Sequence, residues 1–501
     1  MRWAHRPFQF LVSAVISARC DARRGLAVAL GSVSLCLGVP LKEEEVAAKS
    51  ENNKKRNKKK KQKKNQQKVK EEEAKNIGRR RRKKKQKAEG VKEEEREIAG
   101  DDESCREVQV AATGKAMEEC ELERRWRRKR EEAGEMLEAM SGVALFNLAP
   151  NLSVSRLCLG TMTFGEQNTL SDSYRLLDQA FHAGINFFDS AEMYPVPQRP
   201  ATCGRSEEYL ARWIKQRHIP RDRLVIATKV AGPSAQMTWI RGGPKCLDAA
   251  NITQAIDDSL LRMQMDYIDL YQIHWPDRYV PMFGEIEYDP VRQYFSISIE
   301  EQLEALSTAV KAGKASGSIR YIGLSNETPY GLMKFIHVAE KYASHLKIVS
   351  LQNSYSLLCR TFDSAMAECC HQESVSLLAY SPLAMGILSG KYFSSDGGPT
   401  NARLNLFKGR YAEGDSRYNL SNKFIREATM EYLNIAKKYG LHPVSLAIAF
   451  VLRHPLVASV IFGATKSWQL REVLNACKIE LTSEVIEEIN MIHSRFPNPC
   501  P

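Results

Sequence analysis

The sequence predicts an α/β protein, a parallel (β/α)8 barrel preceded by a long disordered N-terminal extension. The first observation behind this prediction is the distribution of charge. The chain of 501 residues carries a formal net charge of +13, with 73 Lys and Arg against 60 Asp and Glu. Residues 1–150 hold 37 of the basic and 25 of the acidic residues, so nearly all of the net charge belongs to the first third. The remainder is close to neutral, which excludes a globally basic domain that coats nucleic acid.

The second observation is a repeat of short apolar runs and amphipathic stretches from residue 143 onward. Buried parallel strands are near-continuous apolar runs, and a helix follows each strand in a β-α unit. The expected strands are 156–159, 186–189, 224–229, 267–274, 319–324, 348–352, 376–380 and 457–462. The expected helices include 171–183, 206–217, 252–263, 300–311, 330–342, 362–372 and 427–439. Gly184, Gly313 and Gly440 are predicted to end helices, and the stretch 145–154 with its Pro150-Asn151 turn predicts a hairpin across the barrel floor.

Residues 1–41 contain five Arg and a single acid, Asp21. This composition is typical of an organelle transit peptide, and an extension without a targeting role is the alternative. The 12 Cys show no spacing of a disulfide framework or zinc site, and no stretch reaches the roughly 20 apolar residues of a membrane-spanning helix. We therefore expect a soluble intracellular protein with reduced thiols, in the cytosol or, if residues 1–41 act as a transit peptide, in the chloroplast.

Residues 42–142 form a charged, low-complexity region. Near-pure basic runs at 54–64 and 79–85 alternate with Glu triplets at 71–73 and 93–95. Apolar residues are too few to bury a core, so the region is expected to be disordered. A solvated tail that makes weak electrostatic contacts is one interpretation. A nuclear-localisation signal and an arm that binds RNA or an anionic membrane surface are the others.

Polar side chains stand at the carboxyl ends of the predicted strands, which is where barrels of this kind carry their chemistry. The second, third and fourth strands present Asp189, Lys229 and His274, and Tyr194 follows shortly after the second strand. A tyrosine hydroxyl has an unperturbed pKa of about 10, which a neighbouring ammonium lowers, and a carboxylate holds the ammonium in place. An imidazole beside the phenol can orient a carbonyl oxygen. The four side chains together predict proton transfer to a carbonyl group.

Six stretches of the sequence resemble the aldo-keto reductase family. They are GTMTFG at 160–165, NFFDSAEMY at 186–194, VIATK at 225–229, DYIDLYQIHWPD at 266–277, RYIGLSN at 320–326 and AYSPL at 379–383. The similarity extends over about 145–496, and the segments 163–167 and 274–281 resemble the Tas-type branch of the family. The resemblance implies a TIM barrel that reduces carbonyl compounds with NADPH and without a metal.

The resemblance implies a role for each of the four polar residues. Tyr194 would be the general acid that protonates the developing alkoxide. Lys229 and Asp189 would tune Tyr194, and His274 would orient the carbonyl. Hydride would pass from the nicotinamide to the carbonyl carbon, and in the reverse direction Tyr194 would act as a base on an alcohol.

The resemblance also implies a groove for NADPH or NADP+, with NADH less favoured. Tyr380 would stack on the nicotinamide ring, and Lys466 would face the 2′-phosphate, unless it is only a solvated lysine at a helix start. Val473 stands where the family usually has Asn or Asp, which leaves the preference for NADP open. No Gly-x-Gly-x-x-Gly follows a strand, so no Rossmann site is expected. The implied cofactor-binding residues are Gly160, Thr161, Met162, Ser325, Asn326, Gln352, Tyr380, Ser381, Leu383, Gly386, Leu388, Lys391, Gly463, Thr465, Lys466, Gln469 and Glu472.

The substrate pocket predicted beside this groove contains Trp275, Phe164 and Arg278. Trp275 begins a long aromatic loop, 275–298, which either sets specificity or packs onto the barrel. The implied partner is a small carbonyl or alcohol substrate. Three hypotheses follow: an active reductase, a cofactor-binding redox-sensing module resembling channel β-subunits, and an enzyme whose basic tail binds RNA or a membrane surface. Slow turnover with tight NADPH binding would distinguish the second from the first.

Overall fold

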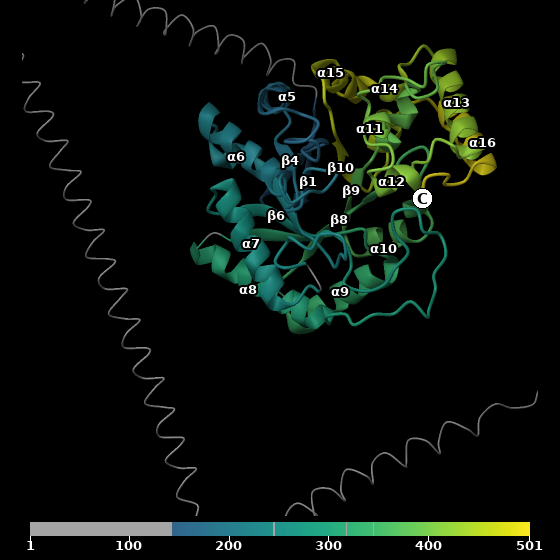
Figure 1. The fold of residues 1–501 in the computed structure, drawn as a ribbon. Coiled ribbons are helices and arrows are strands. Elements are labelled where there is room, and N and C mark those ends of the chain that lie inside the picture. The colour runs from purple at the N-terminus through teal and green to yellow at the C-terminus, as the bar shows by residue number, and fades with distance from the viewer. Residues whose placement is uncertain (1–142, 244–245, 317, 344) are drawn as a thin grey trace, which may run out of the picture. The chain divides into compact units, whose positions relative to one another are not determined.

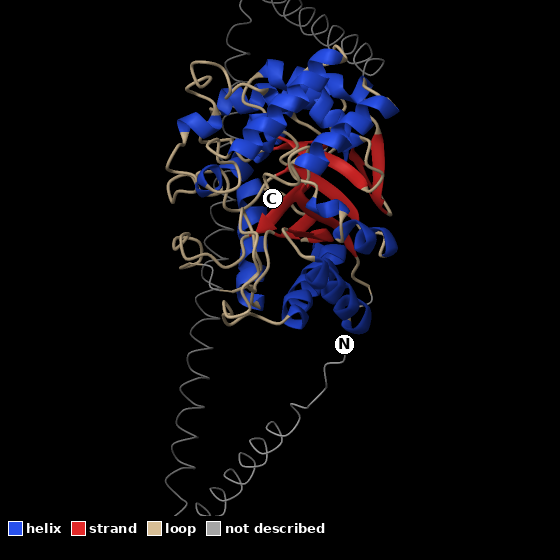
Figure 2. Ribbon diagram, turned by 90° about the vertical axis from the view of Figure 1, so that its right-hand side faces the viewer, coloured by secondary structure: helices blue, strands red, loops and turns tan. Residues whose placement is uncertain are grey.

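The computed structural model describes residues 143–501, apart from 244–245, 317 and 344. The expectations for residues 1–41 and 42–142 therefore lie outside the described residues. Figures 1 and 2 show the described part of the chain as a set of strands surrounded by helices.

The predicted barrel is confirmed. Its eight strands close in the order β10-β3-β4-β5-β6-β7-β8-β9, and each neighbouring pair is parallel. The strands are β3 (Leu157–Gly160), β4 (Phe187–Asp189), β5 (Val225–Val230), β6 (Ile268–Ile273), β7 (Ile319–Ser325), β8 (Ile348–Ser354), β9 (Ser376–Tyr380) and β10 (Val457–Phe462). Strands β3, β4, β5, β6 and β10 are buried along their whole length, which is why they appear in the sequence as mainly apolar runs with a few buried polar residues such as Asp269 and Gln272.

The predicted hairpin is also present, formed by β1 (Leu145–Ala149) and β2 (Leu152–Ser155). Asn151 makes the turn with a φ of 60°, a left-handed conformation that asparagine tolerates better than most residues. Leu148, Leu152 and Val154 of the hairpin belong to one buried cluster with apolar residues of the barrel strands. The hairpin therefore covers the end of the barrel where the strands begin.

The helices surround the barrel. They are α5 (Leu170–His182), α6 (Arg205–Arg217), α7 (Ala249–Met263), α8 (Ile299–Ser316), α9 (Pro329–Tyr342), α10 (Met366–Gln372), α13 (Lys423–Lys438), α14 (Pro443–Leu452), α15 (Ser467–Asn475) and α16 (Ser483–Arg495). Two short helices, α11 (Arg403–Leu406) and α12 (Ala412–Asp415), lie in the connection that leads from β9 to α13. The short 3-10 turns are η1 (Arg221–Arg223), η2 (Thr361–Asp363), η3 (Ala384–Ser389) and η4 (Ala476–Lys478).

Two helix predictions need correction. Gly313 does not end a helix, because α8 continues to Ser316. A glycine inside a helix costs only about 1 kcal/mol relative to alanine, so it does not by itself stop one. The stretch predicted as one helix at 362–372 is instead divided between η2 and α10, with Ala365 outside helical geometry at the break.

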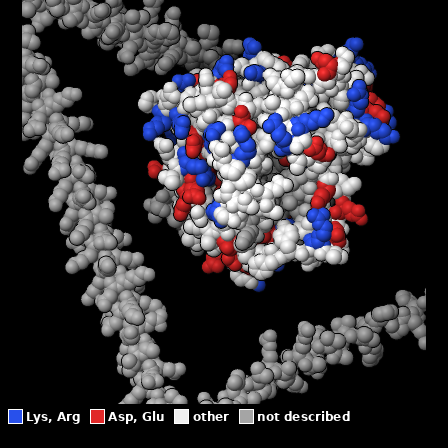
Figure 3. Space-filling model, in the orientation of Figure 1, with Lys and Arg blue, Asp and Glu red and all other residues white. Residues whose placement is uncertain are grey.

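The surface of the barrel carries both signs of charge. Figure 3 shows Lys and Arg interspersed with Asp and Glu on the visible face. The eight described cysteines form no disulfide with one another. Within residues 143–501, gaps excepted, no single helix has the length and apolar character to cross a membrane; α13 and α14 pass that test only as a pair bent by 97°.

Candidate active site

A cavity of about 550 Å³ opens where the barrel strands end. Its walls include Gly160, Asp189, Ser325, Gln352 and Tyr380, which stand at or near the carboxyl ends of β3, β4, β7, β8 and β9. Further walls come from the connection between β9 and α13 and from the first turn of α15. The cavity therefore lies at the end of the barrel predicted to carry the chemistry.

Lys229 and Asp189 form a buried ion pair at the base of this cavity. The Lys229 Nζ lies 2.5 Å from Asp189 Oδ2 and donates to the Ser190 carbonyl oxygen at 2.7 Å. The side-chain amides of Gln272 and Gln352 donate to the other carboxylate oxygen of Asp189, at 3.2 and 3.0 Å. Since Lys229 has no exposed surface and Asp189 is 2 % exposed, neither charge can turn to solvent. The ammonium is thus fixed behind Asp189.

Tyr194 and His274 face each other above this pair. Their ring centroids are 5.7 Å apart in an edge-to-face arrangement, and the Lys229 Nζ lies 5.2 Å from the centroid of the Tyr194 ring. Both rings line the cavity, although each residue is only 8 % exposed. The structure therefore brings together the four residues predicted from three strand ends.

Burial controls the protonation of both rings. It raises the pKa of Tyr194 well above its usual value of 10, and the nearby carboxylates of Asp189 and Glu413 raise it further. Burial lowers the pKa of His274 well below 6.5, and the charge of Lys229 acts in the same direction. The phenol is therefore protonated and the imidazole neutral at neutral pH. The lowered phenol pKa expected from the sequence is wrong for this structure, because burial outweighs an ammonium already paired with Asp189.

Asn326 connects the cavity wall to the residues around it. Its amide donates to the His274 carbonyl oxygen at 2.8 Å, and its side-chain oxygen accepts from the Tyr380 hydroxyl at 2.7 Å. The Ser325 hydroxyl donates to the Gln352 carbonyl oxygen at 2.9 Å. Asn326 also has a φ of 52°, which turns its side chain out of the line of β7. Hydrogen bonds thus join the polar ends of β7, β8 and β9 into one wall.

A left-handed stretch after β9 forms the part of the cavity suited to phosphate. Ser381, Ala384, Met385 and Gly386 all have positive φ values, between 46° and 90°. Backbone that repeatedly enters this conformation makes concave nests of N–H groups that bind anions. A Cβ on Gly386 would stand 2.6 Å from the Lys391 Nζ, so the absence of a side chain there leaves room for that ammonium.

Two cations face the same part of the cavity. Lys391 and Arg403 both line it, and burial together with the charge of Arg403 lowers the pKa of Lys391 to about 8. Among the described residues, neither forms an ion pair with a carboxylate, and the Arg403 guanidinium instead meets the Met385 sulfur at 3.1 Å. Two partly buried cations without a counter-charge among the described residues fit an anionic group such as the pyrophosphate or phosphate of a dinucleotide.

The first turn of α15 forms the far end of the cavity. The side-chain oxygen of Gln469 accepts from the backbone N–H groups of Thr465 and Lys466, at 2.8 and 3.2 Å. Gln469 thereby caps the helix, and Lys466 is an exposed residue of the cavity wall. Glu472 accepts from the Ser445 hydroxyl at 2.7 Å and lines the cavity beside Val473.

Most of the residues predicted to bind the cofactor line this cavity. Those that do are Gly160, Met162, Ser325, Asn326, Gln352, Tyr380, Ser381, Leu383, Gly386, Lys391, Gly463, Thr465, Lys466, Gln469 and Glu472. Thr161 and Leu388 lie behind the wall and are almost fully buried. Thr161 donates twice to the Asp189 carbonyl oxygen, from its backbone N–H at 2.9 Å and from its hydroxyl at 3.0 Å.

The three residues predicted for the substrate pocket lie elsewhere. Phe164 is a core residue without exposed surface. Arg278 is paired with Glu327, with NH1 3.0 Å from Oε2, and is not part of the cavity wall. Trp275 stands behind His274, with ring centroids 4.9 Å apart, and its indole N–H donates to the Pro233 carbonyl oxygen at 3.0 Å.

Sequence reasoning missed several polar residues of the cavity wall. Arg417 donates to Glu413 at 2.8 Å and to the Tyr380 hydroxyl at 3.2 Å, and Tyr411 donates to Glu413 at 2.7 Å. Ser416 ties this segment to the loop after β6, because its hydroxyl donates to the Phe283 carbonyl oxygen at 2.8 Å. The segment lies in an irregular connection, where no periodic pattern indicated which side chains face inward. The long gap between the predicted elements 376–380 and 427–439 was the one available signal.

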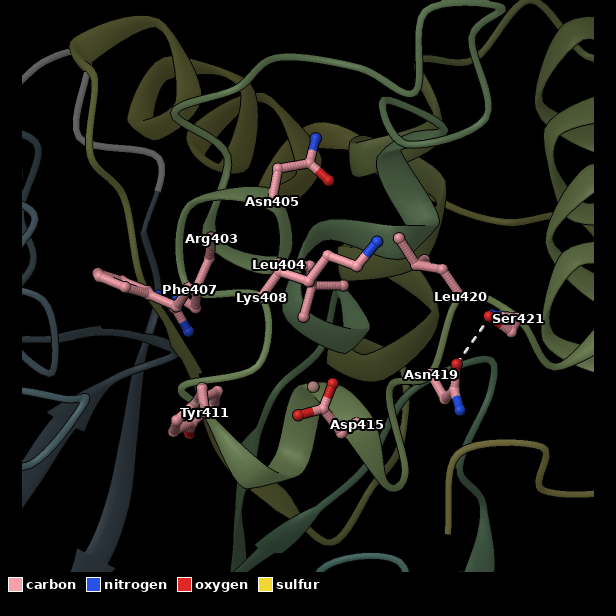
Figure 4. Close-up of a pocket in the computed structure, with 11 residues that line it drawn as sticks. Arg403, Leu404, Asn405, Phe407, Lys408, Tyr411, Asp415, Asn419, Leu420 and Ser421 are labelled. Atoms are coloured by element: carbon pink, nitrogen blue, oxygen red, sulfur yellow. Dashed lines mark hydrogen bonds between the residues drawn. The ribbon is translucent and has the colours of Figure 1, made fainter.

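A smaller cavity of about 310 Å³ lies beside the first, and Figure 4 shows its lining residues. All of them belong to the segment 403–421, and Arg403 and Tyr411 line both cavities. The backbone N–H of Ser421 donates to Asn419 at 2.9 Å, the dashed line in Figure 4. No group of three or more His, Cys, Asp or Glu side chains in the part of the chain that the structure describes is arranged to hold a metal.

Comparison with known proteins relates this site to a family. A sequence model described as the aldo/keto reductase family matches residues 156–494. Protein tas of Escherichia coli strain K12 is 44 % identical over 351 residues, which cover 70 % of this chain and 97 % of that protein. L-glyceraldehyde 3-phosphate reductase of the same organism is 30 % identical over 65 % of this chain and 84 % of that protein. A probable voltage-gated potassium channel subunit beta of Oryza sativa subsp. japonica is 30 % identical over 69 % of this chain and 95 % of that protein.

Proposed function

The chain belongs to the aldo/keto reductase family, and from this premise we propose that it reduces an aldehyde or ketone to the alcohol, reversibly, with NADPH. The observation that carries the proposal is the arrangement of Tyr194, His274 and the Lys229–Asp189 pair around one cavity at the carboxyl ends of the strands. A cavity of this kind, with convergent polar groups and ring protonation set by burial, is what a carbonyl-reducing site requires.

The protein's own groups would handle the proton and the carbonyl. Tyr194, protonated at neutral pH, would donate its proton to the oxygen as negative charge develops there. His274 is neutral, so it would contribute a hydrogen bond that orients the carbonyl without competing as an acid. Lys229 would stabilise the phenolate left on Tyr194, because its ammonium is held 5.2 Å from the ring centroid by Asp189.

The phosphate-suited part of the cavity supports NADPH as the cofactor. Lys391 and Arg403 would hold its phosphates, with the backbone of the left-handed stretch after β9. Tyr380 would lie against the nicotinamide, with Ser325, Asn326 and Gln352 on its carboxamide. When bound, the cofactor supplies the hydride; the protein supplies orientation and charge.

A second function is favoured by one specific relative. The rice protein whose printed name is a channel subunit beta has 30 % identity to this chain, so a cofactor-binding regulatory module with little turnover is the alternative. The relative named for L-glyceraldehyde 3-phosphate reduction, also at 30 % identity, favours turnover of an aldehyde. The complete set of four polar residues makes the reductase the preferred proposal.

The test is oxidation of NADPH by the full chain with 4-nitrobenzaldehyde, compared with its Tyr194→Phe variant. We expect turnover by the parent, and a loss of about 10²-fold or more in kcat in the variant, because the phenyl ring keeps the packing and removes the proton donor. NADPH binding, measured by the quenching of protein fluorescence, should be similar in both proteins. A folded parent that binds NADPH tightly and oxidises it at the rate of the variant would favour the regulatory module instead.

A further inference from the structure

One buried carboxylate joins the loop that carries Tyr194 to the end of β5. Glu192 Oε1 accepts from the backbone N–H of Ala231 at 2.7 Å, and the Glu192 N–H donates to the Lys229 carbonyl oxygen at 3.2 Å. Glu192 precedes Tyr194 by two residues, and Ala231 follows Lys229 by two. The two hydrogen bonds therefore connect the backbone beside the phenol directly to the backbone that carries the ammonium.

Arg241, in the loop between β5 and α7, supplies the counter-charge. Its NH1 lies 2.5 Å from Glu192 Oε2 and its NH2 3.0 Å from Oε1, a two-pronged pair whose side chains are 5 % and 3 % exposed. The Arg241 Nε donates to Asn251 of α7 at 3.1 Å. Arg241 also has a φ of 45°, a left-handed conformation that costs free energy in a residue with a side chain. The contacts with Glu192 and Asn251 hold Arg241 in this conformation, which supports a structural role for the arginine in this loop.

We propose that the Glu192–Arg241 pair is a positioning device that sets the distance and orientation of Tyr194 relative to Lys229. The inference rests on the proposed function, since it assumes that Tyr194 protonates a carbonyl oxygen and that Lys229 stabilises the resulting phenolate. Neither Glu192 nor Arg241 lines the cavity, so the pair acts through Tyr194. A buried carboxylate that loses its partner is strongly destabilised, and the loop would move to reach solvent. Displacement by about 1 Å can cost on the order of 10²-fold in rate.

The chain offers a matched control at the opposite end of β5. Arg221 lies before the strand and pairs with the buried Asp269 at 2.5 Å, with side chains 21 % and 1 % exposed. Asp269 also accepts from the backbone N–H of Ile226 at 2.9 Å. This pair also joins an arginine to a buried carboxylate that ties down a strand, and it is remote from Tyr194. It differs in one respect, because Asp269 also pairs with Arg320, whose NH1 lies 2.8 Å from Oδ1. Its loss should therefore reduce stability without a specific effect on turnover.

The test uses the full chain and compares Arg241→Ala, Arg241→Lys, Glu192→Gln and Arg221→Ala. We expect Arg241→Ala to lower kcat by about 10- to 100-fold while the Kd for NADPH changes by less than about twofold. Arg241→Lys, which keeps a cation, should recover part of that loss. Glu192→Gln should lower kcat less than Arg241→Ala, because the glutamine side-chain oxygen can still accept from the Ala231 N–H and from Arg241. Arg221→Ala should lower Tm with kcat at the parental value.

Three outcomes would overturn the inference. One is a folded Arg241→Ala protein with the parental kcat. Another is an equal fall of kcat in Arg241→Ala and Arg221→Ala, which would mean that the Glu192–Arg241 pair contributes only to the stability of the fold. If Arg241→Ala does not fold, parental kcat in both Arg241→Lys and Glu192→Gln contradicts the inference. A parent that binds NADPH without turnover would instead overturn the proposed function, and the premise of this inference with it.

Discussion

The protonation of Tyr194 depends on two opposing effects at one residue. A neighbouring ammonium stabilises the phenolate, and burial stabilises the phenol. In this structure the phenol is favoured, because the pKa of Tyr194 lies well above 10 and the Lys229 ammonium is occupied by Asp189. Tyr194 therefore carries its proton at neutral pH, which is the form that a general acid needs at the start of the proposed reduction.

Lys391 gives a prediction about pH. Its pKa of about 8 is lower than usual because of burial and the charge of Arg403, so its ammonium loses the proton within an accessible range. The ammonium form attracts phosphate, so NADPH affinity should be highest below pH 8 and should fall as the pH rises through that value. The measurement is the Kd for NADPH at pH values on both sides of 8.

The control for this prediction is Lys391→Arg. An arginine keeps its charge at all these pH values, so the fall in affinity should disappear. If the parent and Lys391→Arg have the same pH dependence, another group controls binding, and the assignment of Lys391 to a phosphate is wrong.

Residue types and strand ends were enough to predict four polar residues that the structure brings together, and not enough to predict the whole wall of the cavity. Asp189, Lys229 and His274 could be placed because each ends a buried strand. Arg417 and Glu413 could not, because their direction depends on an irregular connection folding back over the strand ends. Phe164 was predicted to line the substrate pocket, but it is buried in the core. An apolar residue near a predicted pocket can pack into the core instead of facing the cavity, and the sequence does not distinguish the two.

At the scale of elements, the β1–β2 hairpin gives a prediction about stability. Leu152 is 2 % exposed and packs with apolar strand residues at the barrel end opposite the cavity. Leu152→Ala should lower the free energy of unfolding by about 2–5 kcal/mol, because the removed side chain leaves a cavity in a closed layer. Since the site lies at the other end of the strands, kcat should stay at the parental value. Denaturant unfolding and steady-state kinetics on the same protein check both parts, and a fall in kcat without loss of stability would contradict the separation.

The strands and helices show why some element boundaries can be predicted from the sequence and others cannot. The buried strands β9 and β10 begin and end where apolar runs do, so their predicted limits are confirmed. The end of α8 was wrong because a glycine is a weak stop signal when the chain beyond it still favours a helix. The break between η2 and α10 depends on a local turn that no periodic pattern marks.

At the scale of the whole molecule, charge and hydrophobic pattern divide the sequence at the same place. Residues 1–150 carry 37 basic and 25 acidic side chains of the totals of 73 and 60, and the described barrel begins at 143. The near-neutral barrel has mixed surface charge, as Figure 3 shows, and it contains the complete candidate site. The barrel architecture was predictable because eight β-α units in the sequence each indicate the same fold. The path of a single irregular connection is indicated by no such repeated pattern.

The central claim is that this chain passes a hydride to a carbonyl carbon and a proton to its oxygen. The most direct measurement uses NADPH that carries deuterium at the transferred position of nicotinamide C4. The full chain reduces 4-nitrobenzaldehyde with this cofactor, and the position of the deuterium in the product is determined. We predict 4-nitrobenzyl alcohol with one deuterium on the carbinol carbon, formed in step with NADPH oxidation and lost in Tyr194→Phe. NADPH that stays bound while no labelled alcohol forms would contradict the claim.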